Sequence, residues 1–186
     1  MYVYNHKLIQ QIKAHLRNGG VIAYPTESCY GLGCNPFNHR AINKIIRIKG
    51  RSKTKGLIVI AGKLEQLNTL IQPLPASSKA ELAHYWPGFY SLILKVTRKV
   101  PRNLIGAHRK IAVRVTQHRA VQQLCRELKQ PLVSTSANKT GCKSIKSYRE
   151  CLRQFGKQVL VLPGLIGLEQ KPSTIIDWES KKILRK

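Results

Sequence analysis

The chain has 186 residues, of which 33 are Lys or Arg and 8 are Asp or Glu, so its formal charge is +25. With 42% hydrophobic residues it can bury a core, which excludes a disordered chain, and its length suits one domain over residues 1–186. No run reaches the roughly 18 apolar residues of a membrane-spanning helix, and the charge favours partners that carry phosphates or other anions.

Hydrophobic periodicity predicts that helices and strands alternate along the chain. The first helix has apolar residues at helical spacing from Leu8 to Leu16, with Asn5 as its N-cap and Gly19-Gly20 after its end. Further helices are predicted at residues 41–48, 120–128 and 145–155. Strands are predicted at residues 21–24, 57–61, 92–96, 111–115, 132–135, 158–162 and 174–176, and residues 181–186 are either a frayed tail or a last strand. These elements predict one α/β domain with a mixed sheet.

The cysteines and histidines indicate a reduced protein without a zinc site. The five cysteines form no C-x-x-C pair, and the N-terminal segment is too polar for a signal peptide, so we expect a cytoplasmic location. The six histidines show no spacing typical of zinc ligands, and Asp177 is the only Asp in the chain. We expect no metal held by the protein itself, and any metal to arrive on the phosphates of a substrate.

The segment Tyr24-Pro-Thr-Glu-Ser-Cys-Tyr-Gly-Leu-Gly33 follows a predicted strand and is expected to form a turn. Its hydroxyl and backbone N–H groups suit a small ligand, although ordinary surface turns use the same residues for conformational reasons. Glu27 is the only acid among the first 64 residues. It either orients a ligand amine or pairs with a neighbouring cation.

A basic stretch, Lys49-Gly-Arg-Ser-Lys-Thr-Lys55, places four cations within seven residues just before an apolar strand. The mutual repulsion of these cations is relieved when an anion binds. The flanking Gly50 and Gly56 and the immediate entry into a buried strand make a phosphate site as good an interpretation as a solvated loop.

Arg114 is flanked by valines inside a predicted strand. A cation among buried residues needs a carboxylate or phosphate partner, and with so few acids in the chain that partner is expected to be a ligand. An outward-facing arginine is the alternative that the sequence leaves open.

Two clusters of hydroxyl groups adjoin predicted strands. Ser134-Thr-Ser-Ala-Asn138 begins at the carboxyl end of an apolar strand, which is where open α/β sheets bind ligands. Helix capping is the alternative, but capping would use one hydroxyl and not three with an Asn. Pro172-Ser-Thr174 repeats the arrangement on a smaller scale, with a plain loop as its alternative.

With these segments in order, the sequence resembles the YrdC/TsaC family, the bacterial threonylcarbamoyl-AMP synthases. The matching segments are VIAYPTESCYGLG, IIRIKGRSKTKGLIVIA, WPG, IAVRVTQH, PLVSTSAN and PSTIID followed by ILR. The resemblance implies a single-domain, twisted, open α/β sheet with flanking helices and a concave basic face. It also implies a reaction in which L-threonine, bicarbonate and ATP give threonylcarbamoyl-adenylate and pyrophosphate.

The resemblance assigns roles to individual residues. It implies that Lys49 and Arg51 are the catalytic cations of a KxR motif. The residues on the ATP side are Lys49, Arg51, Lys55, Ser136, Asn138, Ser144 and Arg185. Those on the threonine side are Thr26, Ser28, Arg114, Ser134 and Ser173, with Arg114 suited to the amino-acid carboxylate. Mg²⁺ is expected to enter on the phosphates of ATP.

The sequence departs from the family pattern at the pocket wall. The family signature WPGPxT reads here Trp86-Pro-Gly-Phe-Tyr-Ser91, which changes one wall of the predicted pocket. Ile60 stands where longer relatives place a threonine-binding His, and Lys55 stands where they often have an ATP-binding Asn. Ser28 replaces a common Thr but keeps the hydroxyl.

Other partners and functions stay open at this point. The resemblance implies that partner proteins later pass the activated group to the adenosine beside the anticodon of tRNA. The charge of +25 also suits tRNA or another RNA on a basic face, and the alternative function is a non-catalytic, basic RNA-binding module. A third interpretation is a module that hydrolyses carbamoyl phosphate, as in hydrogenase maturation proteins, but the short chain disfavours it.

Overall fold

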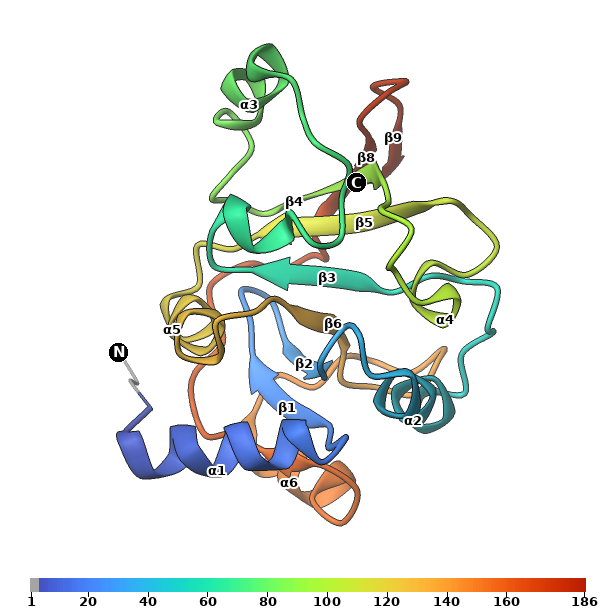
Figure 1. The fold of residues 1–186 in the computed structure, drawn as a ribbon. Helices are drawn as coiled ribbons and strands as arrows, with labels where there is room; N and C mark the ends of the chain where they lie inside the picture. The colour runs from blue at the N-terminus through green and yellow to red at the C-terminus, as the bar shows by residue number, and fades with distance from the viewer. Residues whose placement is uncertain (1–3) are drawn as a thin grey trace.

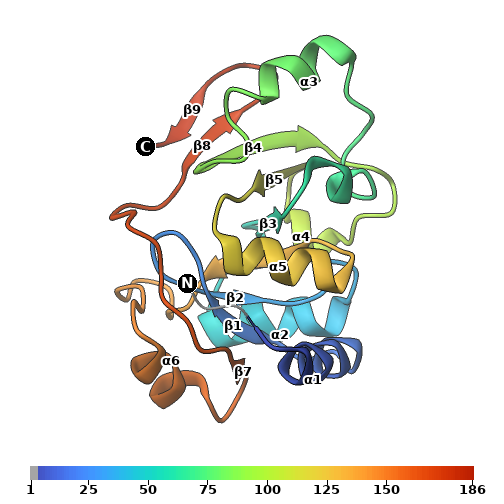
Figure 2. The same ribbon diagram turned by 90° about the vertical axis from the view of Figure 1, so that its left-hand side faces the viewer.

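Nine strands form one mixed sheet in the computed structural model, which describes residues 4–186 (Figure 1). The strands are β1 (Ile22–Pro25), β2 (Tyr30–Gly33), β3 (Ile58–Ala61), β4 (Tyr90–Lys95), β5 (Lys110–Val115), β6 (Leu132–Ser136), β7 (Leu160–Val161), β8 (Thr174–Asp177) and β9 (Ile183–Arg185). Their order is β7-β1-β2-β6-β3-β5-β4-β8-β9. The pairs β1/β7, β3/β5 and β4/β8 are parallel, and the other neighbours are antiparallel. Figure 2 shows the long connection from β7 to β8 crossing the molecule toward the opposite end of the sheet.

Helices connect and cover these strands. They are α1 (His6–Arg17), α2 (His39–Lys49), the 3₁₀ helix η1 (Leu64–Leu67), α3 (Ala76–Leu82), α4 (Arg102–Ile105), α5 (Arg119–Leu128) and α6 (Tyr148–Phe155). Side chains of Asn5, Asn38 and Ser147 accept backbone hydrogen bonds and begin α1, α2 and α6. Gly50, at a φ of 58°, ends α2 just before the basic stretch. Within residues 4–186, no helix is both long enough and apolar enough to cross a membrane.

The two faces of the sheet pack against different helices. Because successive strand residues point to opposite faces, Val59 and its partner Val133 lie on one face, and Ile60 and its partner Leu132 lie on the other. The first face forms a large core with α2, α4 and α6. The second face packs against α1 and α5, but only over part of its area. The remaining part of this second face is the floor of a cavity.

The strand register explains why the second face of the sheet lines the cavity at one position and is buried under helices two residues further along. Ile58 pairs with Ser134 on one side and with Ala112 on the other, so these three side chains share the face that Ile60 and Leu132 occupy further along. Ile58, Ala112 and Ser134 line the cavity, whereas Ile60 and Leu132 are buried under the helices. The antiparallel pairing thereby brings the carboxyl end of β6 beside the start of β3.

The predicted helices and most predicted strands are confirmed, with some corrections at their ends. The helix predicted from residue 145 begins at Tyr148, because Ser147 caps it and the backbone of Ile145 bonds to Ala137 and Tyr30 instead. Only Leu160–Val161 of the predicted strand at 158–162 is a strand. Of the two alternatives for residues 181–186, the last strand is confirmed as β9.

Four elements were not predicted, namely β2, α3, α4 and η1. The turn prediction for residues 24–33 was wrong at its end, because Tyr30–Gly33 is a buried strand. Glycine weakens strand signals in a sequence, but here it permits close packing. A Cβ atom on Gly33 would lie 2.6 Å from the Val133 carbonyl oxygen.

Candidate functional site

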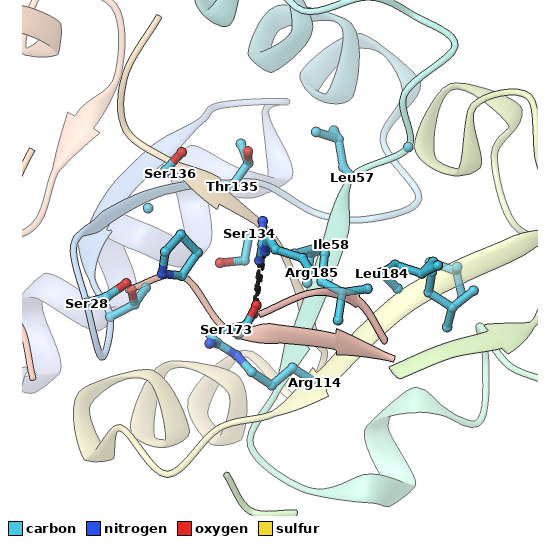
Figure 3. A pocket seen from close by; sticks show the side chains of 18 of the residues that line it. Ser28, Leu57, Ile58, Arg114, Ser134, Thr135, Ser136, Ser173, Leu184 and Arg185 are labelled. Carbon is cyan, nitrogen blue, oxygen red and sulfur yellow. Dashed lines mark hydrogen bonds between the residues drawn. The ribbon is translucent and has the colours of Figure 1, made fainter. Parts of the chain in front are cut away.

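A cavity of about 760 Å³ lies over the part of the sheet that α1 and α5 leave uncovered (Figure 3). Its walls come from segments far apart in the sequence: the β1–β2 turn, the basic stretch before β3, β5, the end of β6, and the β8–β9 hairpin. Arg51, Arg114, Ser136 and Ser173 all line it, although they belong to four of these segments. Segments far apart in the sequence therefore meet at one cavity.

Four arginines line this cavity, and three of them, Arg51, Arg114 and Arg185, come from predicted site segments. Arg51 donates to the carbonyl oxygen of Gly56 at 2.8 Å, which holds its side chain along the wall before β3. Arg185 donates to the carbonyl oxygen of Ser173 from Nε at 3.0 Å and from the terminal nitrogen at 2.8 Å. Figure 3 shows Arg114 and Arg185 on two sides of Ser173. Carbonyl oxygens orient the guanidinium groups of Arg51 and Arg185 but do not neutralise their charge.

The electrostatics of the three arginines favour an anionic ligand. Burial lowers the pKa of Arg185, and the positive charges of Arg114 and Arg51 lower it further. Burial also lowers the pKa of Arg51. The one acid among the lining residues is Asp177, whose carboxylate is 2.9 Å from the Lys110 ammonium. An anion bound here would thus meet a cluster of cations with little competing negative charge.

Arg114 has a protein partner, which corrects one expectation from the sequence. Its guanidinium lies 3.1 Å from the Glu27 carboxylate, and both side chains are almost fully buried. Thr116 Oγ1 donates to the other Glu27 oxygen at 2.5 Å. The outward-facing alternative for Arg114 was wrong, and of the two readings of Glu27 the pairing with a cation is confirmed. Arg114 still lines the cavity, and its Nε is buried without a hydrogen-bond partner among residues 4–186.

Lys49 lies behind the cavity wall and holds the loop that follows β6. Its ammonium donates to the carbonyl oxygens of Ser136 at 2.5 Å and Asn138 at 2.9 Å, and to Asn138 Oδ1 at 3.3 Å. Asn138 in turn donates to the carbonyl oxygen of Cys142. Burial, together with the charge of Arg51, lowers the pKa of Lys49 to about 8. Lys49 therefore couples the basic stretch to the hydroxyl cluster.

The predicted site residues divide into two groups by position. Those that line the cavity are Thr26, Ser28, Arg51, Arg114, Ser134, Ser136, Ser144, Ser173 and Arg185. Lys49 and Asn138 bond to each other behind the wall, and Lys55 is exposed, with its carbonyl oxygen accepting from Arg51 Nε. The catalytic, ATP-side and threonine-side roles of all of these residues stay predictions.

Phe89, one residue before β4, and Ser91, within it, were not predicted as site residues. Phe89 lines the cavity, and its ring centroid is 5.0 Å from Cζ of Arg114. Ser91 is fully buried, and its Oγ is 2.8 Å from Ser173 Oγ. The only signal for either residue was the departure from the family signature, which marked the segment but not its contacts.

The side chains present suit a metal that arrives with a substrate. Among residues 4–186, no three His, Cys, Asp or Glu side chains gather as a group of potential ligands. Asp177 is bonded to Lys110, and Glu27 is bonded to Arg114 and Thr116. The hydroxyl groups and cations of the wall instead suit the phosphate oxygens that would carry such a metal.

Fold and site together define an α/β protein with a cationic, hydroxyl-lined pocket for an anionic ligand. The Sua5/YciO/YrdC family model, described as "Telomere recombination", matches residues 14–186. The chain therefore belongs to this family, and the resemblance seen in the sequence is confirmed.

Known relatives agree with this membership. A protein of Chromobacterium violaceum named threonylcarbamoyl-AMP synthase is 55% identical over 179 residues, which cover 96% of this chain and 93% of the relative. The crystal structure of E. coli YciO matches with a TM-score of 0.85 at 31% identity, covering 98% of this chain and 90% of that one. P. abyssi Sua5 complexed with L-threonine matches with a TM-score of 0.87 at 29% identity, covering 96% of this chain. This chain spans about half of the Sua5 chain, 53%.

Proposed function

We propose that this protein is a threonylcarbamoyl-AMP synthase, an enzyme that joins L-threonine, bicarbonate and ATP into threonylcarbamoyl-adenylate and releases pyrophosphate. The observation that carries the proposal is the convergence of Arg51, Arg114, Ser136 and Ser173 on one cavity. A curated relative of that name at 55% identity and a Sua5 structure complexed with L-threonine support it.

The cavity has the two kinds of recognition that the reaction needs. Arg51 and Arg185 line the cavity, and their proposed role is to neutralise phosphate oxygens, which planar guanidinium groups bind through paired hydrogen bonds. The proposed role of Arg114, whose buried Nε has no hydrogen-bond partner among residues 4–186, is to bind the carboxylate of the amino acid. Mg²⁺ is proposed to enter as part of the MgATP substrate.

The reaction requires positioning and charge neutralisation more than a protein nucleophile. The threonine amine attacks the carbon of bicarbonate, a C–O bond breaks and water leaves, which gives a carbamate. A carbamate oxygen then attacks the α-phosphorus of ATP. The bond from that phosphorus to the bridging oxygen breaks, and pyrophosphate leaves with the electron pair. Arginine side chains stabilise the charge on the phosphates, and the pocket holds the carbamate in line with the leaving group.

The direct test is pyrophosphate release from MgATP with each of the twenty amino acids, with and without bicarbonate. We expect release only with L-threonine and bicarbonate together, and a product with the mass of threonylcarbamoyl-adenylate. Pyrophosphate release that does not depend on bicarbonate, or that is faster with another amino acid, would overturn the proposed reaction.

RNA is a further proposed partner, and a second groove supports it. This groove, of about 910 Å³, lies between α2, the loop after β6 and α6, and has no acid in its lining. Its cations are Lys44, Arg47, Lys139 and Lys157. Within the described residues none of the four has an acidic side chain as an ion-pair partner. Such a groove suits the phosphate backbone of RNA.

The RNA proposal can be tested by tRNA binding at several salt concentrations. We expect the variant Lys44→Gln/Arg47→Gln to bind more weakly and to reduce the slope of log affinity against log salt by about 2. The control Arg98→Gln/Lys99→Gln removes the same charge from the exposed loop after β4. Equal effects of both variants would exclude a groove-specific site, and tRNA binding without any pyrophosphate release would favour the non-catalytic RNA-binding module.

Delivery of the product to other proteins of tRNA threonylcarbamoyl transfer, and a cytoplasmic location, are also proposed. The product is a reactive mixed anhydride, so direct transfer to a partner protein would protect it from hydrolysis. All five cysteines are free thiols in the structure, which agrees with a reducing compartment. Neither point depends on the RNA groove.

A further inference from the structure

The turn before β4 brings an aromatic ring against the guanidinium of Arg114. Gly88 N donates to the carbonyl oxygen of Val115 at 2.9 Å, which ties the turn to the end of β5. Trp86 Nε1 donates to the carbonyl oxygen of Tyr90 at 2.8 Å, which closes the turn on itself. Phe89 lies between these two anchors and one residue before β4, so its backbone is held close to the strand that carries Arg114.

The Arg114 guanidinium is thus constrained from two directions. Glu27 binds one of its terminal nitrogens at 3.1 Å, and the ring centroid of Phe89 lies 5.0 Å from its Cζ. Phe89 itself is half-buried and lines the cavity. An aromatic ring attracts the cation and excludes water near it, but it cannot accept the in-plane hydrogen bonds of the N–H groups. The buried Nε of Arg114 has no hydrogen-bond partner among residues 4–186, so its N–H is left unsatisfied and would be satisfied by a ligand carboxylate.

We propose that Phe89 is a positioning residue for Arg114 and, through it, for the carboxylate of the amino-acid substrate. The inference rests on the proposed function, because it takes the anion at Arg114 to be an amino acid. Glu27 holds the guanidinium through one terminal nitrogen only, so rotation about that contact is the motion left for neighbouring side chains to restrict. The Phe89 ring restricts this motion, so the guanidinium meets the carboxylate in one orientation and loses less entropy on binding.

The neighbouring Tyr90 provides a matched control. Its ring packs edge-on against Tyr85 at a centroid distance of 5.4 Å, and Tyr90 is 40% exposed. It does not line the cavity. Phe89→Leu and Tyr90→Leu therefore remove aromatic rings from adjacent positions, of which only one contacts Arg114. Phe89→Tyr keeps the ring face and serves as the conservative rescue.

The test compares binding of L-threonine and L-threoninamide, which lacks the carboxylate, by titration calorimetry on the full-length protein. For Phe89→Leu we expect threonine affinity to fall about fivefold to tenfold, threoninamide affinity to stay unchanged, and the KM for ATP to stay within twofold. Phe89→Tyr and Tyr90→Leu should keep the wild-type affinity for threonine.

Three results would overturn the inference: unchanged threonine affinity in Phe89→Leu, an equal loss for threonine and threoninamide, or the same loss in Tyr90→Leu. Failure of the proposed function has a different signature, since the wild-type protein would then release no pyrophosphate with threonine. If another amino acid supports release, the same comparison with that amino acid and its amide tests Phe89. If none does, the proposed function and this inference both fall.

Discussion

The second face of the sheet has two regions that differ in what covers them. Under α1 and α5, Ile60 and Leu132 are fully buried among leucine, isoleucine and valine side chains. Two residues away along the same strands, Ile58 and Ser134 line a cavity that is also lined by four arginines. Both regions belong to the same strands and share one backbone register.

The difference shows how a sheet can be stable and still leave room for a ligand. In the covered region, apolar side chains bury their surface against helices, and each buried residue adds stability. In the open region a covering helix would have to desolvate cations that have few acids to pair with, which costs free energy unless an anion is present. Arg51 and Arg185 of the open region have no acidic ion-pair partner among residues 4–186 and thus depend on a ligand for charge compensation, whereas the apolar covered region needs none.

Replacing a cavity cation should affect catalysis most and stability little. For Arg51→Ala we expect pyrophosphate release to fall about 1,000-fold, equivalent to roughly 4 kcal/mol, because a preorganised positive charge facing the phosphates is lost. The steady-state rate and the urea unfolding curve measure the two effects. Lys53→Ala removes an exposed cation two residues away and should be near wild type. Full activity of Arg51→Ala would refute the role of this residue.

Replacing a buried side chain in the covered region should give the opposite result. Leu124 of α5 is fully buried against this face, so Leu124→Ala should lower the free energy of unfolding by about 3 kcal/mol. The KM for threonine should not change when measured below the unfolding transition. Leu165→Ala is the control, because Leu165 is 83% exposed and its loss should change stability by less than about 0.5 kcal/mol. A raised KM in Leu124→Ala would mean that the two regions are coupled.

Arg114→Lys separates charge from hydrogen-bond geometry in the open region. The lysine keeps a positive charge opposite Glu27 but loses the planar fork, so we expect the KM for threonine to rise about 30-fold while the KM for ATP stays within twofold. The comparison variant is Arg126→Lys, which alters an exposed arginine that lies 3.7 Å from Glu127. An unchanged dependence on threonine would count against the carboxylate assignment.

The loss of ATP affinity on deprotonation of Lys49 should be the smallest of these effects. Its pKa of about 8 means that the ammonium loses its proton as the pH rises from 7 to 9, which removes a charge and a donor from the loop after β6. We expect ATP affinity to fall severalfold over this range in the wild-type protein and to stay flat in Lys49→Arg. The free energy of unfolding should instead rise with pH. The folded protein has then lost this proton, whereas the unfolded chain keeps it up to about pH 10.4. Between pH 8 and that value, wild type should therefore gain stability relative to Lys49→Arg.

Local patterns predicted much of this protein because they act over short distances. The apolar spacing of α1, α2 and α5 and the capping Asn5 are properties of neighbouring residues, and all were confirmed. The hydroxyl cluster at the end of β6 followed from its place after an apolar strand. The strand β2 was missed because Gly31 and Gly33 carry no side chain that signals burial, and their small size matters only once Val133 lies beside them.

Contacts within the site were decided by the tertiary structure. The bond between Thr116 and Glu27 joins residues 89 positions apart, and that between Ser91 and Ser173 joins residues 82 positions apart. The composition established the scarcity of acids, and the motifs nominated Arg51, Arg114 and Arg185. Only the order and register of the strands could show that one of the eight acids faces Arg114. Spacing along a chain specifies helices and strands, whereas the pairing of strands specifies which distant side chains meet.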